Sequence, residues 1–159
     1  MGVGMMVLAW LVALGLGAVF FTDLLDKQVN PNQSLQVTAD IREVVLKRNK
    51  YGHYVATGAI NGQPVVFMLD TGATGVAIPE KIARQLGLRG GRAFQTQTAN
   101  GTAVSYAVTL DRVALGGIEL RDVRAAIAPG LQMDQVLLGM SFLKHIEFTQ
   151  RGDTLILRQ

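Results

Sequence analysis

The sequence predicts a mostly β protein: a small closed β-barrel with one or two short helices, preceded by a single N-terminal transmembrane helix. Three observations support this prediction. The first 21 residues carry no charged side chain. From residue 43 onward, short apolar or alternating segments are separated by glycine-containing turns, which is typical of small barrels. Only one stretch of that region has the apolar spacing of an amphipathic helix.

The N-terminal segment, residues 1–22, is expected to anchor the chain, with residues 1–21 in the lipid bilayer. Its apolar run matches the roughly 20 residues that cross a bilayer core, and the mean hydropathy of the chain is positive at +0.28. A cleaved signal peptide is the alternative. No Lys or Arg precedes the apolar run and no small-x-small cleavage site follows it, so we prefer a retained anchor.

A tether is expected to join this anchor to the barrel. Residues 23–42 include an Asn-Pro-Asn sequence at 30–32, which is typical of irregular structure, and a short strand is expected near 35–37. The barrel domain should then occupy residues 43–159.

Within the domain, the strands are expected to come mainly as hairpins. Asn61-Gly62 lies between two apolar runs, which is the strongest short hairpin pattern. The segment 79–88 predicts a helix, since Pro79 and Glu80 suit its first turn and Gly87 its end. A short helix is expected after Gly139. The other expected elements are a strand at 43–48 and hairpins at 93–110, 112–128 and 146–158.

Composition excludes several classes of site. The chain has no cysteine, so disulfides, thiolate metal sites and cysteine nucleophiles are excluded. His53 and His145 are the only histidines and neither has a ligand cluster around it, so we expect neither a metal nor another cofactor. The net charge is +3, but the longest basic cluster, within residues 47–50, is too short for a nucleic-acid track.

Two further motifs are candidate sites. Ser141 and His145 would share a helix face, but the sequence around the serine lacks the second glycine of a nucleophile elbow. The Arg-Gly-Asp sequence at 151–153 is explained by a hairpin turn.

The most informative stretch is "FMLDTGATGVAIP", residues 67–79, where an apolar strand ends in an acid, a hydroxyl and a glycine. Asp-Thr-Gly alone is a weak motif, and an ordinary turn at Asp70 is the alternative. Its context is more specific. A hairpin precedes it, a strand and a helix follow it, a hairpin with a glycine-containing tip comes next, and the apolar-apolar-Gly stretch at 137–139 comes 69 residues after Asp70.

This order of motifs resembles a retropepsin-like aspartic protease, in particular the bacterial membrane-anchored branch, over residues 43–159. The resemblance implies that Asp70 is the catalytic residue. It implies an active-site loop supported by Thr71, Gly72 and Ala73, in which Thr71 braces the loop across a dyad and Gly72 lets substrate approach the backbone. It further implies a flap tip at Asn100 and Gly101, structural support beneath the loop from Leu137, Leu138 and Gly139, and an interface strand at 154–158.

Two carboxylates that share one proton can activate water and protonate a carbonyl oxygen without metal. This chain has one Asp-Thr-Gly and is too short for two lobes, so the resemblance implies a homodimer with one Asp70 from each subunit. The predicted function is a membrane-anchored aspartic endopeptidase acting on a peptide or protein. The alternative is a non-catalytic, membrane-tethered β-barrel that binds a peptide or protein, with or without the protease fold, and in which Asp70 makes a turn.

Departures from the family pattern suggest how this chain would differ. Pepsin-type enzymes have a hydroxyl residue where Ala73 stands, so the pair should keep its proton to higher pH and work toward near-neutral pH. Met140 replaces a basic residue that forms an ion pair in many retroviral members, which predicts a weaker dimer. Anchoring in one bilayer is expected to favour pairing by raising the local concentration.

The expected location is the bacterial inner membrane, with a single pass and the catalytic domain in the periplasm. This orientation rests on the family resemblance and on the scarcity of Lys and Arg just after the apolar run.

Overall fold

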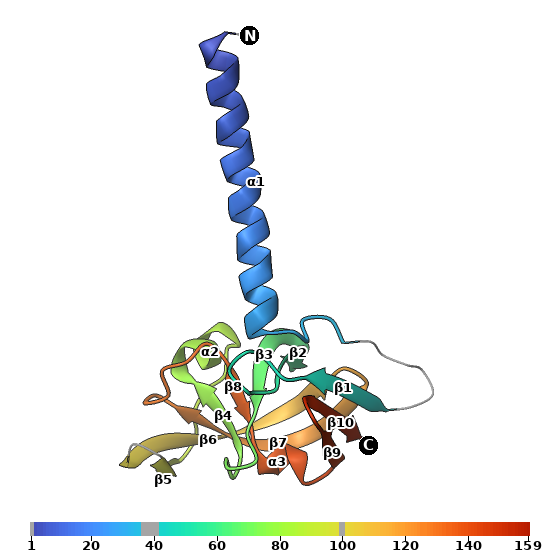
Figure 1. Ribbon diagram of the computed structural model, residues 1–159. Coiled ribbons are helices and arrows are strands. Elements are labelled where there is room, and N and C mark those ends of the chain that lie inside the picture. The colour runs from blue at the N-terminus through green and yellow to red at the C-terminus, as the bar shows by residue number, and fades with distance from the viewer. Residues whose placement is uncertain (1, 36–41, 99–100) are drawn as a thin grey trace.

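The computed structural model describes residues 2–35, 42–98 and 101–159, and it consists of one long helix standing on a β domain (Figure 1). The helices are α1 (Val3–Val29), α2 (Glu80–Gln85) and α3 (Met140–Leu143). The strands are β1 (Glu43–Lys47), β2 (Val55–Ile60), β3 (Gln63–Leu69), β4 (Val76–Pro79), β5 (Ala93–Thr98), β6 (Gly101–Leu115), β7 (Ile118–Ala128), β8 (Val136–Leu138), β9 (Glu147–Arg151) and β10 (Thr154–Arg158).

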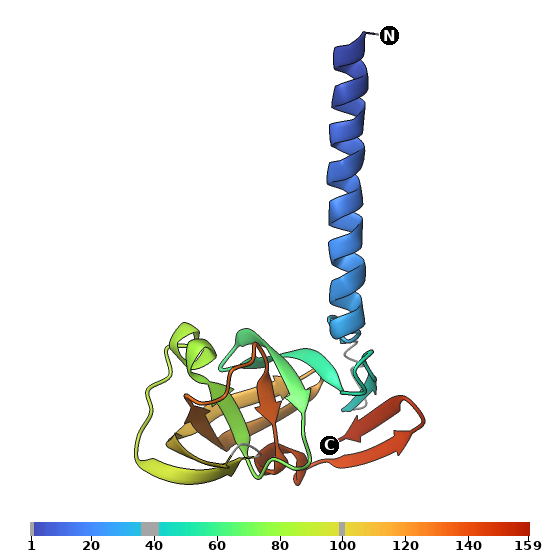
Figure 2. The ribbon, with the colours of Figure 1, turned by 60° about the vertical axis from the view of Figure 1, so that its left-hand side comes forward.

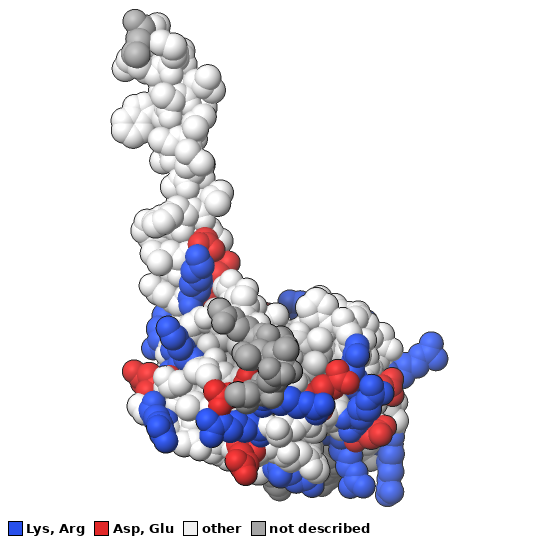
Figure 3. Space-filling view, turned by 90° about the vertical axis from the view of Figure 1, so that its right-hand side faces the viewer, with Lys and Arg blue, Asp and Glu red and all other residues white. Residues whose placement is uncertain are grey.

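Helix α1 is long and apolar enough to cross a membrane. Its 27 residues correspond to about 40 Å, against about 30 Å for a bilayer core. None of its residues is buried by the domain. Its far part is free of charged side chains, and the first charges lie near its lower end (Figure 3). The helix runs past residue 22 and includes an ion pair of 2.6 Å between Lys27 and Asp23, so the first part of the expected tether is helical.

The predicted closed barrel is confirmed. Six strands follow one another in the order β2-β3-β8-β4-β7-β6, and β6 pairs back with β2 through Ala59↔Ala114 and Ile60↔Val113. Gly58 lies at this closure, where an added Cβ would meet the Ala114 carbonyl oxygen and lie 2.7 Å from the Phe67 ring. The absence of a side chain at residue 58 therefore lets β2 and β6 approach each other.

The predicted hairpin turn at Asn61-Gly62 is confirmed, whereas the tip of the 93–110 hairpin includes residues 99–100, which lie outside the described residues. Asn61 and Gly62 have φ of 50° and 82°, as a tight two-residue hairpin turn requires. One difference concerns β6, which runs unbroken through the point where two separate hairpins, 93–110 and 112–128, were expected. The side chains of Asp111 and Arg112 are exposed, so their charge does not interrupt the strand.

The two short helices also agree with the prediction, although α2 is shorter than the expected 79–88. Ile82 and Ala83 are its buried face. Helix α3 buries Phe142 and Leu143 directly after Gly139.

A second, three-stranded sheet lies beside the barrel in the order β1-β10-β9. The C-terminal strand β10, residues 154–158, was expected to supply an interface strand. It is instead the central strand, paired with β1 on one edge and β9 on the other. The two outer strands of this sheet are β1 and β9.

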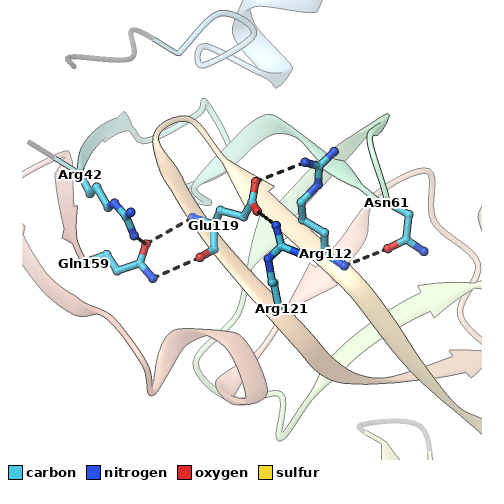
Figure 4. Close-up of polar contacts among 6 residues, drawn as sticks. All are labelled: Arg42, Asn61, Arg112, Glu119, Arg121 and Gln159. Carbon is cyan, nitrogen blue, oxygen red and sulfur yellow. Dashed lines mark hydrogen bonds and ion pairs between the residues drawn. The ribbon is translucent and has the colours of Figure 1, made fainter. Parts of the chain in front are cut away.

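The C-terminal residue ties this small sheet to the barrel (Figure 4). The Gln159 side chain donates to the Glu119 carbonyl (3.1 Å) and accepts from the Glu119 N–H (3.3 Å) and from Arg42 (3.3 Å). The Glu119 carboxylate in turn pairs with Arg112 (3.6 Å) and Arg121 (3.5 Å). These contacts hold the sheet against the β6–β7 hairpin.

Three asparagines fix the lower end of α1 to the domain, and we call Asn30, Asn32 and Asn49 the asparagine clasp. Asn32 is buried; its side chain donates to the carbonyls of Lys47 (2.9 Å) and Val55 (2.7 Å) and accepts from the Lys47 N–H (2.7 Å). Asn49 donates to the Val29 carbonyl (2.9 Å) at the end of the helix, and Asn30 donates to a threonine hydroxyl of β2 (3.1 Å). The helix therefore ends in a built junction.

Candidate active site

The backbone of Asp70 is fixed by two neighbouring segments. It directly follows β3, whose Leu69 N–H donates to the Tyr54 carbonyl (3.0 Å). The Asp70 N–H donates to the Leu138 carbonyl of β8 (3.2 Å), because β3 and β8 run parallel with Leu69 opposite Leu138. The end of strand β3 therefore fixes the position of the Asp70 backbone beside β8.

The loop after Asp70 folds back on the carboxylate. Asp70 is half-buried, and its Oδ1 accepts a hydrogen bond from the Gly72 N–H (2.8 Å). The Ala73 N–H donates to the Asp70 carbonyl (3.2 Å). Thr71 and Gly72 are exposed. The top of this loop is therefore open to a substrate or a second chain.

The structure brings the apolar-apolar-Gly segment directly beneath the loop. Leu138 is buried and Leu137 half-buried in β8. A Cβ on Gly139 would meet the Gly75 carbonyl oxygen and lie 2.5 Å from that of Ala73. The next N–H, that of Met140, donates to the Ala73 carbonyl (2.8 Å). Sequence reasoning had associated these segments only through the family resemblance.

Ser141 is a positioning residue whose role sequence reasoning missed. Its hydroxyl accepts from the Val76 N–H (3.0 Å), where the loop enters β4, and donates to the Arg124 carbonyl of β7 (2.8 Å). That proton is directed at a backbone carbonyl rather than at His145, so the geometry favours a structural serine over a nucleophile. The only available indication was its place just after Gly139.

The β5–β6 hairpin lies at the same end of the domain as the active-site loop, the end away from α1 (Figures 1 and 2). Gly101 opens β6 opposite Thr98, with φ of 107°. Asn100, the other predicted flap residue, lies outside the described residues. Exposed apolar side chains of this hairpin could contact a substrate; they are Phe94, Val104 and Tyr106.

The described residues around Asp70 show neither a metal cluster nor an enclosed pocket that includes its carboxylate. Among residues 2–35, 42–98 and 101–159, no three His, Cys, Asp or Glu side chains are grouped so as to hold a metal ion. A surface hollow of about 240 Å³ does not include Asp70; it is lined by Asp122, Arg124, Ser141, Lys144 and His145. A single carboxylate cannot be base and acid in the same step, so Asp70 alone does not make an acid–base pair.

Residues 56–145 match the protein family described as "gag-polyprotein putative aspartyl protease". A related, uncharacterized protein from the cobV 5' region of Sinorhizobium is 36% identical over 121 residues, which is 74% of this chain and 52% of the relative. An uncharacterized protein of Rickettsia prowazekii is 30% identical over 128 residues, which is 78% of this chain and 54% of that protein. The chain spans about half the length of these relatives.

Solved structures agree with this family. A retropepsin-like aspartic protease from Rickettsia conorii superposes with a TM-score of 0.64 at 30% identity, covering 74% of this chain and 99% of that one. EIAV protease in complex with the inhibitor HBY-793 gives a TM-score of 0.50 at 19% identity over 63% of this chain and 93% of that one, a similarity of fold alone. The chain therefore belongs to the gag-polyprotein aspartyl protease family and has the retropepsin-like fold.

Proposed function

We propose that this protein is a homodimeric, membrane-anchored aspartic endopeptidase with Asp70 of each subunit as its catalytic pair. The observation that carries this proposal is the placement of half-buried Asp70 in a loop of the retropepsin-like barrel that rests on Gly139 and Met140 and has Thr71 and Gly72 exposed. The support beneath the loop holds the backbone rigidly while the carboxylate stays accessible.

In this mechanism the two carboxylates share one proton, because two negative charges held close together are unfavourable. The ionised carboxylate takes a proton from a water molecule, which attacks the scissile carbonyl carbon. The protonated carboxyl donates its proton to the carbonyl oxygen. Proton transfer to the amine then allows the C–N bond to break.

The neighbouring residues would orient these groups. Thr71 is exposed beside Asp70 and is proposed to brace the two loops across the dyad. Gly72 leaves its backbone open to an extended substrate. Asn100 and Gly101 are proposed to close over the substrate and exclude water.

The proposed setting is the bacterial inner membrane, with α1 as the single span and the domain in the periplasm. The length and apolar character of α1 support the span. Residues 1–21 would then lie in the bilayer. The asparagine clasp would hold the domain at the surface of the membrane.

Cleavage of a diverse peptide pool tests the enzymatic proposal. The full chain, purified in a mild detergent at high concentration, is incubated with the pool from acidic to neutral pH, and products are read by mass spectrometry. We expect cleavage that is lost in Asp70→Asn, since the amide cannot act as a base. Cleavage that persists in this variant would refute the assignment of Asp70.

The second candidate is a non-catalytic binding module. The exposed apolar side chains of the β5–β6 hairpin are consistent with it, because they would bind a peptide whether or not the peptide is then cleaved. A wild-type sample that is dimeric, binds peptides and leaves them intact at every pH would support this module and overturn the protease.

A further inference from the structure

A polar hollow lies beside the support of the Asp70 loop, and neither the proposed catalysis nor the membrane anchor uses it. None of the residues that line it is apolar, so it is unsuited to an apolar side chain or an acyl chain. We call it the α3 hollow, because three of its residues lie in α3 or directly after it. Its volume is about 240 Å³, and it is lined by Asp122, Arg124, Ser141, Lys144 and His145.

One side of the hollow is placed by the turn that follows α3. The helix buries Phe142 and Leu143. The Lys144 N–H donates to the Met140 carbonyl (3.1 Å), and the His145 N–H donates to the Phe142 carbonyl (3.1 Å). The backbones of Lys144 and His145 are therefore fixed, while both side chains are exposed.

The hydroxyl of Ser141 joins the two sides of the hollow. It donates to the Arg124 carbonyl of β7 (2.8 Å) and accepts from the Val76 N–H of β4 (3.0 Å). Because only the backbone of Arg124 makes this bond, its guanidinium stays available to a ligand. The hydroxyl also links the hollow to the loop that carries Asp70, since this loop enters β4 at Val76.

The α3 hollow is positively charged. Its four charged or titratable residues form no ion pair within the part of the chain that the structure describes. Arg124 and Lys144 are cationic at neutral pH, against the single carboxylate of Asp122. The hollow therefore keeps a net positive charge even when His145 is neutral.

These groups fit an oxyanion. A guanidinium offers N–H groups in a fixed fork, an ammonium adds a point charge, and a neutral imidazole still has one N–H donor. The volume of about 240 Å³ is several times the roughly 30 Å³ that a water molecule occupies in the liquid. The hollow therefore has room for one tetrahedral anion and a few water molecules.

Asp122 would select among such anions. An ionised carboxylate repels an anion that has lost all its protons, but it accepts a hydrogen bond from an anion that has kept one. Near neutral pH inorganic phosphate keeps a proton, whereas sulfate has none. One carboxylate beside three donors therefore favours hydrogen phosphate over sulfate.

We propose that the α3 hollow binds a hydrogen phosphate ion, with Arg124, Lys144 and His145 as hydrogen-bond donors and Asp122 as the acceptor of the ion's proton. A lipid headgroup of the bilayer around α1 is not the source, since α3 lies at the end of the domain away from α1 (Figures 1 and 2). The bound ion would connect β7 to the turn after α3, beside the bonds of Ser141. This binding is independent of the proposed catalysis.

Isothermal titration calorimetry tests the proposal. The full chain, in a non-ionic detergent and a phosphate-free buffer near neutral pH, is titrated with sodium phosphate and separately with sodium sulfate at the same ionic strength. We expect saturable binding of one phosphate per chain and an affinity for sulfate about tenfold lower, because sulfate has no proton to donate to Asp122. Equal affinities, or no saturable phosphate binding at millimolar concentrations, would overturn the proposal.

Arg124→Gln should lower the phosphate affinity by about tenfold or more, since it removes a charged two-point contact. The substitution keeps the Arg124 carbonyl and therefore the bond from Ser141. Arg92→Gln is the matched control, because Arg92 is exposed and forms no ion pair with the described residues but does not line the hollow. Equal losses in both variants would indicate diffuse attraction to a basic surface and reject the site.

Asp122→Asn tests the selectivity. Asparagine tolerates the left-handed backbone that Asp122 adopts, with φ of 51°, so the variant is expected to fold. The amide no longer repels a deprotonated anion, and the affinity for sulfate should rise toward that for phosphate. A variant that keeps the wild-type preference for phosphate would contradict the role of Asp122.

Phosphoserine distinguishes the free ion from a phosphate ester. An ester loses its last proton at about pH 6, so near neutral pH it should bind more weakly than inorganic phosphate. Binding as tight as that of inorganic phosphate would overturn the assignment of a free hydrogen phosphate ion. No arm of this experiment measures peptide cleavage, so a failure of the α3 hollow and a failure of the proposed protease are seen separately.

Discussion

Gly139 shows how a single missing side chain can determine an active-site geometry. The carbonyls of Ala73 and Gly75 occupy the space where its Cβ would lie, and the Met140 N–H bonds the first of them. The hydrogen bond and the close packing at Gly139 fix the backbone of the loop that carries Asp70. They involve the carbonyls of Ala73 and Gly75 and not the Asp70 carboxylate.

Gly139→Ala should therefore destabilise the domain by about 1–3 kcal/mol, because backbone atoms rather than a flexible side chain oppose the added methyl group. Peptide cleavage should fall more than this loss of folded protein explains, since the loop must shift. The free energy of unfolding and the cleavage rate of the folded protein are to be measured together.

Gly75→Ala is the matched control on the same loop. An added Cβ there would lie 3.6 Å from the Ser141 hydroxyl, an ordinary contact. Similar losses in both variants would contradict the argument from Gly139.

At the residue scale, the order of motifs located the Asp70 loop and the Gly139 segment, which the structure places in contact, but it did not indicate the role of Ser141. Asp70 and Gly139 belong to a recognisable order of segments. Ser141 has no such context, because a serine near a helix start is common and its two backbone partners come from distant strands.

Among the elements, the junction at the end of α1 is the feature that sequence reasoning described least well. Asn-Pro-Asn is typical of a loop, and the interpretation as a tether followed from composition alone. Asn32 instead replaces a strand partner, since it bonds both backbone groups of Lys47 and the carbonyl of Val55.

Asn32→Ala should lower the free energy of unfolding by about 2–3 kcal/mol, because it leaves backbone groups of β1 and β2 without partners. Thermal unfolding of the full chain in detergent, followed by circular dichroism, measures this change. The neighbouring exposed substitution Gln33→Ala should have little effect, and equal effects would show that the clasp does not stabilise the domain.

The hairpins were easier to predict because their turns are local. Asn61-Gly62 and the turn after β9 depend on backbone conformations that few residues adopt. The central position of β10 was not predictable in this way, since it depends on pairing with β1, more than a hundred residues away in sequence. Pattern analysis therefore gave the strands but not their neighbours in the second sheet.

For the whole molecule, the relation between α1 and the loop that carries Asp70 is decisive. Both views show α1 rising from one end of the domain and this loop at the other (Figures 1 and 2). The proposed site therefore faces away from the end of the domain at which α1 is attached.

The asparagine clasp thus has a consequence for where the protein can work. If α1 lies in a bilayer and the clasp stays closed, the loop that carries Asp70 is held on the side of the domain that faces away from the lipid. A chain would then reach that loop from the aqueous phase rather than along the membrane surface.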